Sequence, residues 1–232
     1  MADLGRLTIA AARPIVVRSG LSPGHDRIWS FSMLRTLSTI IACLVATAAS
    51  AGEFNGVLNI GDSAPAWTDL PGTDGKSHSL ADLKDKKTVV VVFTCNSCPV
   101  ARDYEDRIMA LAKQNPQDVA VVAINVNRGA EDSLAKMTER AQERGFPYLY
   151  LADETQNIGR AYGASATPDF FVLSPDRKIV YMGSLDDNND AASAKVNYVA
   201  DAVRAALAGT KAATGETFAR GCGIRYARQR SK

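Results

Sequence analysis

One stretch of this 232-residue chain, Thr88–Phe93, reads Thr-Val-Val-Val-Val-Phe and is apolar at almost every position. Valine and phenylalanine favour extended backbone, and a strand that is apolar at successive positions has to bury both of its faces. Such strands occur in parallel sheets that carry helices on both sides. The chain is therefore expected to fold around a mainly parallel sheet between two helical layers.

The segments around this strand alternate between extended and helical patterns. Before it, Asp74-Gly75 predicts a hairpin turn between short extended pieces. After it, the pattern predicts a helix from about 99 to 114, strand 118–126, helix 131–144, strand 148–151, helix 156–162, strands 169–173 and 178–182 around a turn, and helix 195–208. This order predicts an α/β three-layer sandwich with a mainly parallel central sheet and an antiparallel edge hairpin, in one domain over about 55–210.

The segment 33–51 reads as a targeting signal rather than as part of this domain. It begins with Met-Leu-Arg, continues through an apolar stretch and ends with small residues, which is the pattern of a secretory signal peptide. The apolar stretch is shorter than the roughly 20 residues that a membrane-spanning helix needs. We expect cleavage after Ala51, with 1–32 as an upstream extension, and a periplasmic or secreted mature protein. An uncleaved anchor and a lipid-anchored Cys43 are the alternatives.

Charge and cysteine content narrow the function further. A formal net charge of +2 gives no reason to expect a nucleic acid as partner. Of the four cysteines, Cys43 would leave with the signal, so that three remain. Three are too few for a disulfide-stapled scaffold of this length, and an odd number in an oxidising compartment indicates a reactive or shared thiol. Two of the three form one motif.

Cys95-Asn-Ser-Cys98 directly follows the buried strand and directly precedes a helical segment. Dithiol–disulfide exchange requires this spacing, because one sulfur attacks a foreign disulfide and the other is close enough to release it. A helix N-terminus stabilises a thiolate, which is the attacking species. Cys95 lies nearest the end of the strand, and Cys98 lies one turn deeper. We therefore predict that Cys95 is the nucleophile and Cys98 the resolving thiol.

Other uses of the motif fit the sequence less well. A structural zinc site needs four ligands, and the mature chain offers only Cys222 and His78 beyond the motif. A purely structural disulfide over a two-residue loop would constrain little of the unfolded chain. The acidic run 186–190 lacks the glycine and glutamate of a calcium-binding loop and reads as a polar loop. We expect neither a metal nor another cofactor.

Thr167-Pro168 immediately precedes the strand 169–173. A proline there can simply begin an edge strand. In a chain with this cysteine motif, a cis bond fits the position better, since it would leave a backbone edge free to pair with a substrate chain beside the sulfurs.

The motif after a buried strand, the later Thr-Pro before a hairpin and the closing helix resemble the thioredoxin-like superfamily. The opening Gly61-Asp-Ser-Ala-Pro65 and the added strand and helix resemble its redoxin branch, which comprises alkyl hydroperoxide reductases, thiol-specific antioxidant proteins, other peroxiredoxin-like proteins and exported thiol–disulfide reductases. The resemblance implies that Cys95 attacks and Cys98 resolves. It also implies that Thr167 and Pro168 contact the substrate, a disulfide of a protein or small thiol. An exported reductase would need a membrane or exported thiol as electron donor.

The sequence also departs from these families. Thr94 stands where thioredoxins carry tryptophan, and Val89 stands where they carry a buried acid. A proton-transfer group is thus missing or supplied elsewhere; Asp103 and Glu105 are candidates but read as solvated residues. The peroxiredoxin pattern Pro-x-x-x-Thr/Ser-x-x-Cys fits neither cysteine of the motif.

Cys222 lies in the basic tail 211–232, between two glycines that make its backbone mobile. It is either an incidental thiol in a solvated end or a third redox cysteine that folds back onto the motif or pairs between chains. We predict an exported thiol–disulfide oxidoreductase. A thiol-dependent peroxidase is the first alternative, and a module that binds Cu(I) through the two thiolates is the second.

Overall fold

The computed structural model describes residues 52–228. The predicted signal segment 33–51, the upstream residues 1–32 and Cys43 lie outside the described residues. The domain is built on a five-stranded sheet in the order β5-β4-β3-β7-β8. Its strands are β3 (Thr88–Thr94), β4 (Val119–Asn125), β5 (Leu149–Ala152), β7 (Asp169–Leu173) and β8 (Ile179–Gly183).

The sheet combines three parallel strands with an edge hairpin. β3 pairs in parallel with β4, and β4 with β5, whereas β7 runs antiparallel to β3 and β8 antiparallel to β7. β3 occupies the centre and is buried at all seven positions, which is why its sequence is apolar without alternation. The predicted α/β fold class, with parallel strands and an antiparallel edge hairpin, is confirmed.

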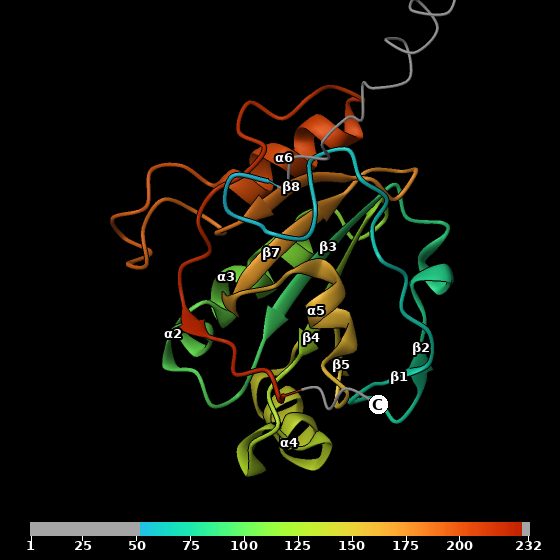
Figure 1. Cartoon of the computed structure of the whole chain (residues 1–232), viewed down its shortest axis with the longest axis vertical. Helices are drawn as coiled ribbons and strands as arrows, with labels where there is room; N and C mark the ends of the chain where they lie inside the picture. Colours follow the sequence, from blue (N-terminus) through green and yellow to red (C-terminus); the bar gives the residue numbers. More distant parts are fainter. Residues whose placement is uncertain (1–51, 229–232) are drawn as a thin grey trace, which may run out of the picture. The chain divides into compact units, whose positions relative to one another are not determined.

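Two apolar layers cover the two faces of the sheet (Figure 1). On one face lie α3 (Glu105–Gln114), α4 (Leu134–Arg144) and α6 (Tyr198–Leu207), and most of their buried residues belong to a single apolar cluster. On the other lie α5 (Asn157–Tyr162) and the segment 52–87, which packs Trp67 against the sheet. That segment contains the predicted hairpin, formed by β1 (Leu70–Pro71) and β2 (Ser77–His78), and the 3-10 turn η1 (Leu80–Leu83).

The helix after the cysteine motif is divided in two. α2 (Pro99–Asp103) begins at the proline, which suits the first helical position because it has no N–H to satisfy. Tyr104 separates α2 from α3, where one continuous helix was expected. The Tyr104 hydroxyl lies 3.1 Å from the Asp186 carboxylate, so a contact distant in sequence holds this side chain at the break.

The last segment differs most from expectation. Residues 211–228 do not form a solvated end but run back across the domain, as the red trace in Figure 1 shows. There β9 (Cys222–Gly223) pairs antiparallel with β6 (Ala166–Thr167). Within residues 52–228, no helix is both long and apolar enough to cross a bilayer.

Candidate functional site

The cysteine motif lies between the end of β3 and the start of α2. Cys95 follows Thr94, the last residue of β3, and Cys98 is the N-cap residue of α2. The Cys98 sulfur accepts a hydrogen bond from the Ala101 backbone N–H at 3.4 Å. Both cysteines are free thiols and only 3% exposed. The strand and the helix thus fix two neighbouring sulfurs beneath the surface.

The Thr167–Pro168 peptide bond is cis, as the sequence predicts. Thr167 contacts both sulfurs: its hydroxyl oxygen lies 3.5 Å from Cys95 Sγ, and its carbonyl oxygen accepts a hydrogen bond from Cys98 Sγ at 3.2 Å. Thr167 is itself buried. The structure therefore brings together the four residues that the sequence analysis selected from two distant segments.

Asp132, which the sequence analysis did not select, holds the loop of the motif in place. It ends the short 3-10 turn η2 (Ala130–Asp132), and its carboxylate accepts hydrogen bonds from the backbone N–H of Asn96 at 2.7 Å and of Ser97 at 3.2 Å. The Ser97 hydroxyl donates a third, at 2.6 Å. One signal could have found it: η2 follows β4, and the carboxyl ends of the parallel β3 and β4 meet at the same edge of the sheet.

A buried polar network extends this support. Asn125, the last residue of β4, donates through Nδ2 to Asp132 at 3.2 Å and to the Tyr150 hydroxyl oxygen at 3.3 Å. Tyr150, from β5, donates its hydroxyl to Asn96 Oδ1 at 2.8 Å. Burial raises the pKa of Tyr150 well above its ordinary value, so this hydroxyl stays protonated and available as a donor. Two strands and one turn therefore fix the loop between the cysteines.

Cys98 has contacts that suit both of its protonation states: as a thiol it donates to the Thr167 carbonyl, and its sulfur accepts from the Ala101 N–H. The Cys95 thiol donates to Cys98, which is the main reason that the pKa of Cys98 is lowered and that of Cys95 raised. The Cys222 thiol and the Ala101 N–H also lower the pKa of Cys98. Burial and the nearby Asp132 charge also raise the pKa of Cys95. This order is the reverse of the expectation that Cys95 carries the thiolate.

The other polar candidates lie elsewhere. Glu105 is not solvated: it is buried and pairs with Arg140 at 2.7 Å and Arg144 at 3.1 Å, so its contacts are with α4 rather than with the sulfurs. Asp103 is exposed. His78 pairs with Asp74 at 3.0 Å across the β1–β2 hairpin. Among residues 52–228, no group of three or more His, Cys, Asp or Glu side chains is arranged to hold a metal ion.

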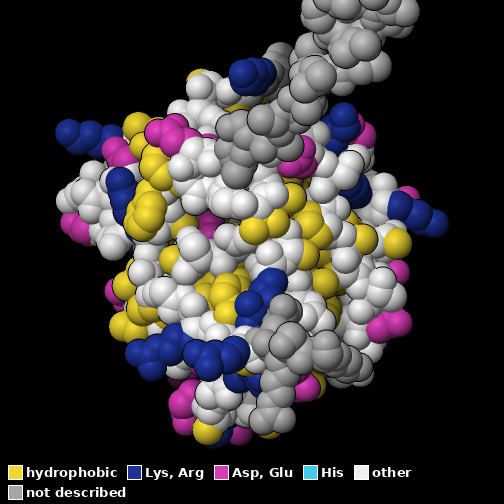
Figure 2. Space-filling view, in the orientation of Figure 1, with side chains coloured by type: hydrophobic (Ala, Val, Ile, Leu, Met, Phe, Trp, Pro, Cys, Tyr) yellow, Lys and Arg dark blue, Asp and Glu magenta, His cyan; other side chains and the backbone are white. Residues whose placement is uncertain are grey.

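A groove opens beside the buried thiols. Cys98 and Cys222 lie in its wall, whereas Cys95 does not, and charged residues of both signs surround them. The charged lining residues are Arg128, Glu131, Asp132 and Arg225. Figure 2 shows Lys and Arg side chains gathered in the part of the view where α2, the red tail and α4 of Figure 1 lie.

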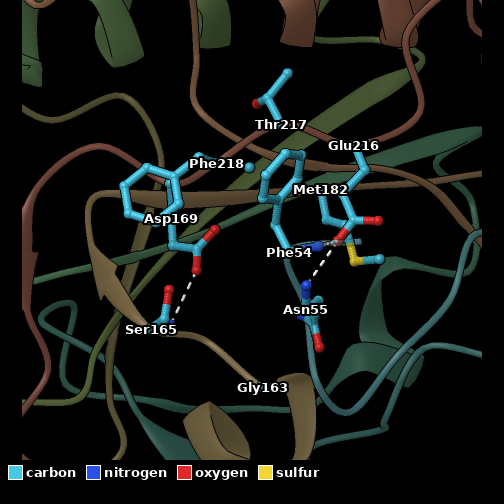
Figure 3. A pocket seen from close by; sticks show the side chains of 11 residues that line it. Phe54, Asn55, Gly163, Ser165, Asp169, Met182, Glu216, Thr217 and Phe218 are labelled. Atoms are coloured by element: carbon cyan, nitrogen blue, oxygen red, sulfur yellow. Dashed lines mark hydrogen bonds between the residues drawn. The ribbon is translucent and has the colours of Figure 1, made fainter. Parts of the chain in front are cut away.

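A second cavity is lined by the first residue of β7, by the tail and by Phe54 and Asn55 (Figure 3). Asp169, the first residue of β7, points into it and accepts a hydrogen bond from the Ser165 N–H at 3.1 Å. Burial raises the pKa of Asp169 to about 7. Glu216, from the tail, lines the same cavity and accepts hydrogen bonds from backbone N–H groups of residues 53–55. The sequence analysis selected neither acid.

Three comparisons place the chain among known proteins. Residues 59–200 match the family model described as Redoxin. The crystal structure of an uncharacterized conserved protein from Geobacillus kaustophilus is 33% identical, with a TM-score of 0.70 over 76% of this chain and 96% of that one. A Mycobacterium tuberculosis protein provisionally named as the peroxiredoxin Rv2521 is 30% identical over 139 residues, 53% of this chain and 83% of the relative.

A more distantly related structure shares the fold. The crystal structure of the peroxidoxin BcpB from Mycobacterium tuberculosis is 22% identical, with a TM-score of 0.50 over 65% of this chain and 95% of that one. At this identity the likeness shows the fold alone.

Proposed function

Because the chain belongs to the redoxin family and has the thioredoxin-like fold that the sequence predicts, we propose that it is a thiol–disulfide oxidoreductase that works through Cys95 and Cys98. One observation carries the proposal. The two cysteines share one buried cluster at the end of a buried strand, and both sulfurs contact Thr167, next to Pro168.

The reaction needs no group beyond the two thiols and a disulfide. One thiolate attacks a substrate disulfide, forms a mixed disulfide with one substrate sulfur and releases the other as a thiolate. The second protein thiol loses its proton and attacks the mixed disulfide, which frees the remaining substrate sulfur. The substrate gains two electrons, and Cys95 and Cys98 become a disulfide. Run backwards, the same steps oxidise a dithiol.

The order of attack is open to direct test. The position of Cys95 at the strand end assigns the attack to Cys95, whereas the hydrogen bonds to Cys98 favour Cys98. In either case the other cysteine resolves the mixed disulfide. The pattern of segment 33–51 supports a site of action in the periplasm or outside the cell, on a disulfide of a protein or small thiol. A membrane or exported thiol would then be the electron donor.

The test is a pair of trapping variants, Cys95→Ser and Cys98→Ser, in the full chain with Cys43→Ser and Cys222→Ser in both. Each reduced protein is mixed with a disulfide-containing peptide, and adducts are located by mass spectrometry under non-reducing conditions. The variant that keeps the attacking thiol and lacks the resolving one should accumulate the mixed disulfide. If the protein with both cysteines forms no Cys95–Cys98 disulfide under the same conditions, the proposal fails.

A peroxidase activity is the second candidate, because one relative carries a peroxiredoxin name. Peroxide would oxidise a thiolate to a sulfenic acid, which the second thiol then converts to a disulfide and water. Stopped-flow measurement with hydrogen peroxide, using a sulfenic-acid trap in the same pair of variants, separates the two activities. Disulfide exchange at a rate far above peroxide consumption would exclude this candidate.

A further inference from the structure

The chain's own tail lies along the backbone edge beside the two thiols. β9 pairs antiparallel with β6, in a register that sets Cys222 opposite Thr167 and Gly223 opposite Ala166. This is the edge that the sequence analysis left free for a substrate chain. An extended peptide and the tail cannot occupy it together, so the protein already holds a strand where we expected a substrate.

The fit of the tail depends on a glycine. A Cβ on Gly221 would lie 2.1 Å from the carbonyl oxygen of Thr167 and 2.5 Å from its carbonyl carbon. Both distances are too short for any Cβ atom. The backbone therefore approaches the edge as closely as it does only because residue 221 has no side chain. The same Thr167 carbonyl accepts the hydrogen bond from Cys98 Sγ.

The tail is fixed on both sides of Cys222. Upstream, the Thr217 hydroxyl oxygen accepts from the Ser184 N–H at 3.0 Å, next to the Glu216 contacts visible in Figure 3. Downstream, the Ile224 N–H donates to the Ser165 carbonyl at 3.0 Å, and the Tyr226 hydroxyl donates to the Ala164 carbonyl at 2.8 Å. Cys222 is thus held in place from both sides, by the Thr217 contact upstream and by the Ile224 and Tyr226 contacts downstream.

Three sulfurs meet at this point. Cys222 packs against the cluster of Cys95, Cys98 and Ala101, and it shares the wall of the groove with Cys98. It is half-buried, whereas the other two are buried. The nearby Cys222 thiol is one of the causes that lower the pKa of Cys98.

From this placement we propose that Cys222 is a third redox thiol that exchanges with Cys98, and that β9 serves as the docked strand that presents it. When Cys98 holds a mixed disulfide, the Cys222 thiolate attacks the Cys98 sulfur. A Cys98–Cys222 disulfide forms, the substrate sulfur leaves as a thiolate, and the proton of Cys222 passes to solvent. Cys95 then attacks Cys98, which moves the disulfide to Cys95–Cys98 and restores Cys222 as a thiol. The inference rests on the proposed exchange at Cys98.

The test uses Cys95→Ser with Cys43→Ser, so that Cys98 and Cys222 are the remaining thiols of the full chain. Treatment of the reduced protein with glutathione disulfide should give a glutathione adduct that converts to a Cys98–Cys222 disulfide, mapped by peptide mass spectrometry. The matched control adds Cys222→Ser, and there the adduct on Cys98 should persist. If the adduct persists equally in both proteins, the inference is wrong.

Gly221→Val tests the docked strand itself. In the Cys95→Ser protein it should slow the loss of the adduct at least about tenfold, because an undocked thiol has a lower effective concentration at Cys98. An unchanged rate would show that β9 does not present Cys222. In the protein that retains Cys95, the Cys95–Cys98 disulfide should still form after Gly221→Val. Measuring this disulfide distinguishes the two failures. If only this inference is wrong, the Cys95–Cys98 disulfide still forms; if the proposed function is wrong, it does not.

Discussion

Two buried carboxylates, Asp132 beside the loop of the cysteine motif and Asp169 directly after Pro168, have different surroundings. Asp132 and Asp169 are 5% and 4% exposed. Asp132 accepts hydrogen bonds from the N–H groups of Asn96 and Ser97, from the Ser97 hydroxyl and from Asn125. Asp169 accepts from backbone N–H groups alone, and burial raises its pKa to about 7.

The difference shows that burial by itself does not decide what a carboxylate does. At Asp132, several donors replace the water that burial removes, so that the carboxylate can organise the loop between the two cysteines. At Asp169, too few donors replace the lost water, and the neutral form is favoured. The first carboxylate supports the candidate active site, and the second makes stability depend on pH.

Replacing Asp132 should have the largest effect. Asp132→Ala leaves three donors of the cysteine loop without their partner, and we expect the free energy of unfolding to fall by about 3 kcal/mol. Disulfide exchange should fall with it, because the loop loses its fixed geometry. Urea unfolding and an exchange assay at pH 7 measure the two effects. If Asp132→Ala lowers the free energy of unfolding no more than a substitution at an exposed residue does, the loop does not depend on this carboxylate.

Asp132→Asn separates charge from shape. The amide oxygen can still accept from the loop N–H groups, so most of the stability should remain. The charge of Asp132 raises the pKa of Cys95, so its removal should lower that pKa and speed alkylation of Cys95 by iodoacetamide at pH 8. Peptide mapping of the alkylated product identifies the cysteine. Slower or unchanged alkylation of Cys95 would contradict the assigned electrostatic effect.

Asp169→Asn should produce a smaller effect that depends on pH. The folded-state pKa of about 7 lies above that of the unfolded chain, so the folded protein retains a proton that the unfolded chain has already lost. Stability should therefore fall as pH rises from about 4 to 7 and stay low above it. The asparagine variant should lose this dependence and be more stable than the parent at pH 8.

Urea unfolding at pH 4.5 and pH 8 tests this, with Asp103→Asn as the control at an exposed position. The stability difference between Asp169→Asn and the parent should grow with pH, and the control should show no such growth. A difference that is constant over this range would show that Asp169 keeps an ordinary pKa in the folded protein.

The sequence predicted the parts of the site that local patterns determine. An apolar run with no alternation identified β3. The position of Thr167-Pro168 directly before a strand identified the cis bond. Asp132 was missed because its contacts depend on β4 lying next to β3, which follows from the order of the elements and not from a local pattern. The same holds for Cys222, whose glycine neighbours indicate mobility in isolation but permit close docking here.

Replacing Tyr150 should have the smallest effect and tests which member of the network matters. Tyr150→Phe removes the hydroxyl that donates to Asn96 Oδ1 at 2.8 Å, but Asn125 keeps its contact with Asp132. The contact in which Asn125 donates to the Tyr150 hydroxyl at 3.3 Å is lost as well, but Asn125 keeps Asp132 as a partner. We therefore expect a decrease of about 1 kcal/mol in the free energy of unfolding. Thermal unfolding of Tyr150→Phe and of Asp132→Ala, measured under the same conditions, compares the two losses of stability. If Tyr150→Phe costs as much as Asp132→Ala, the phenol rather than the carboxylate holds the loop, and the contrast between Asp132 and Asp169 no longer explains the geometry of the cysteine motif.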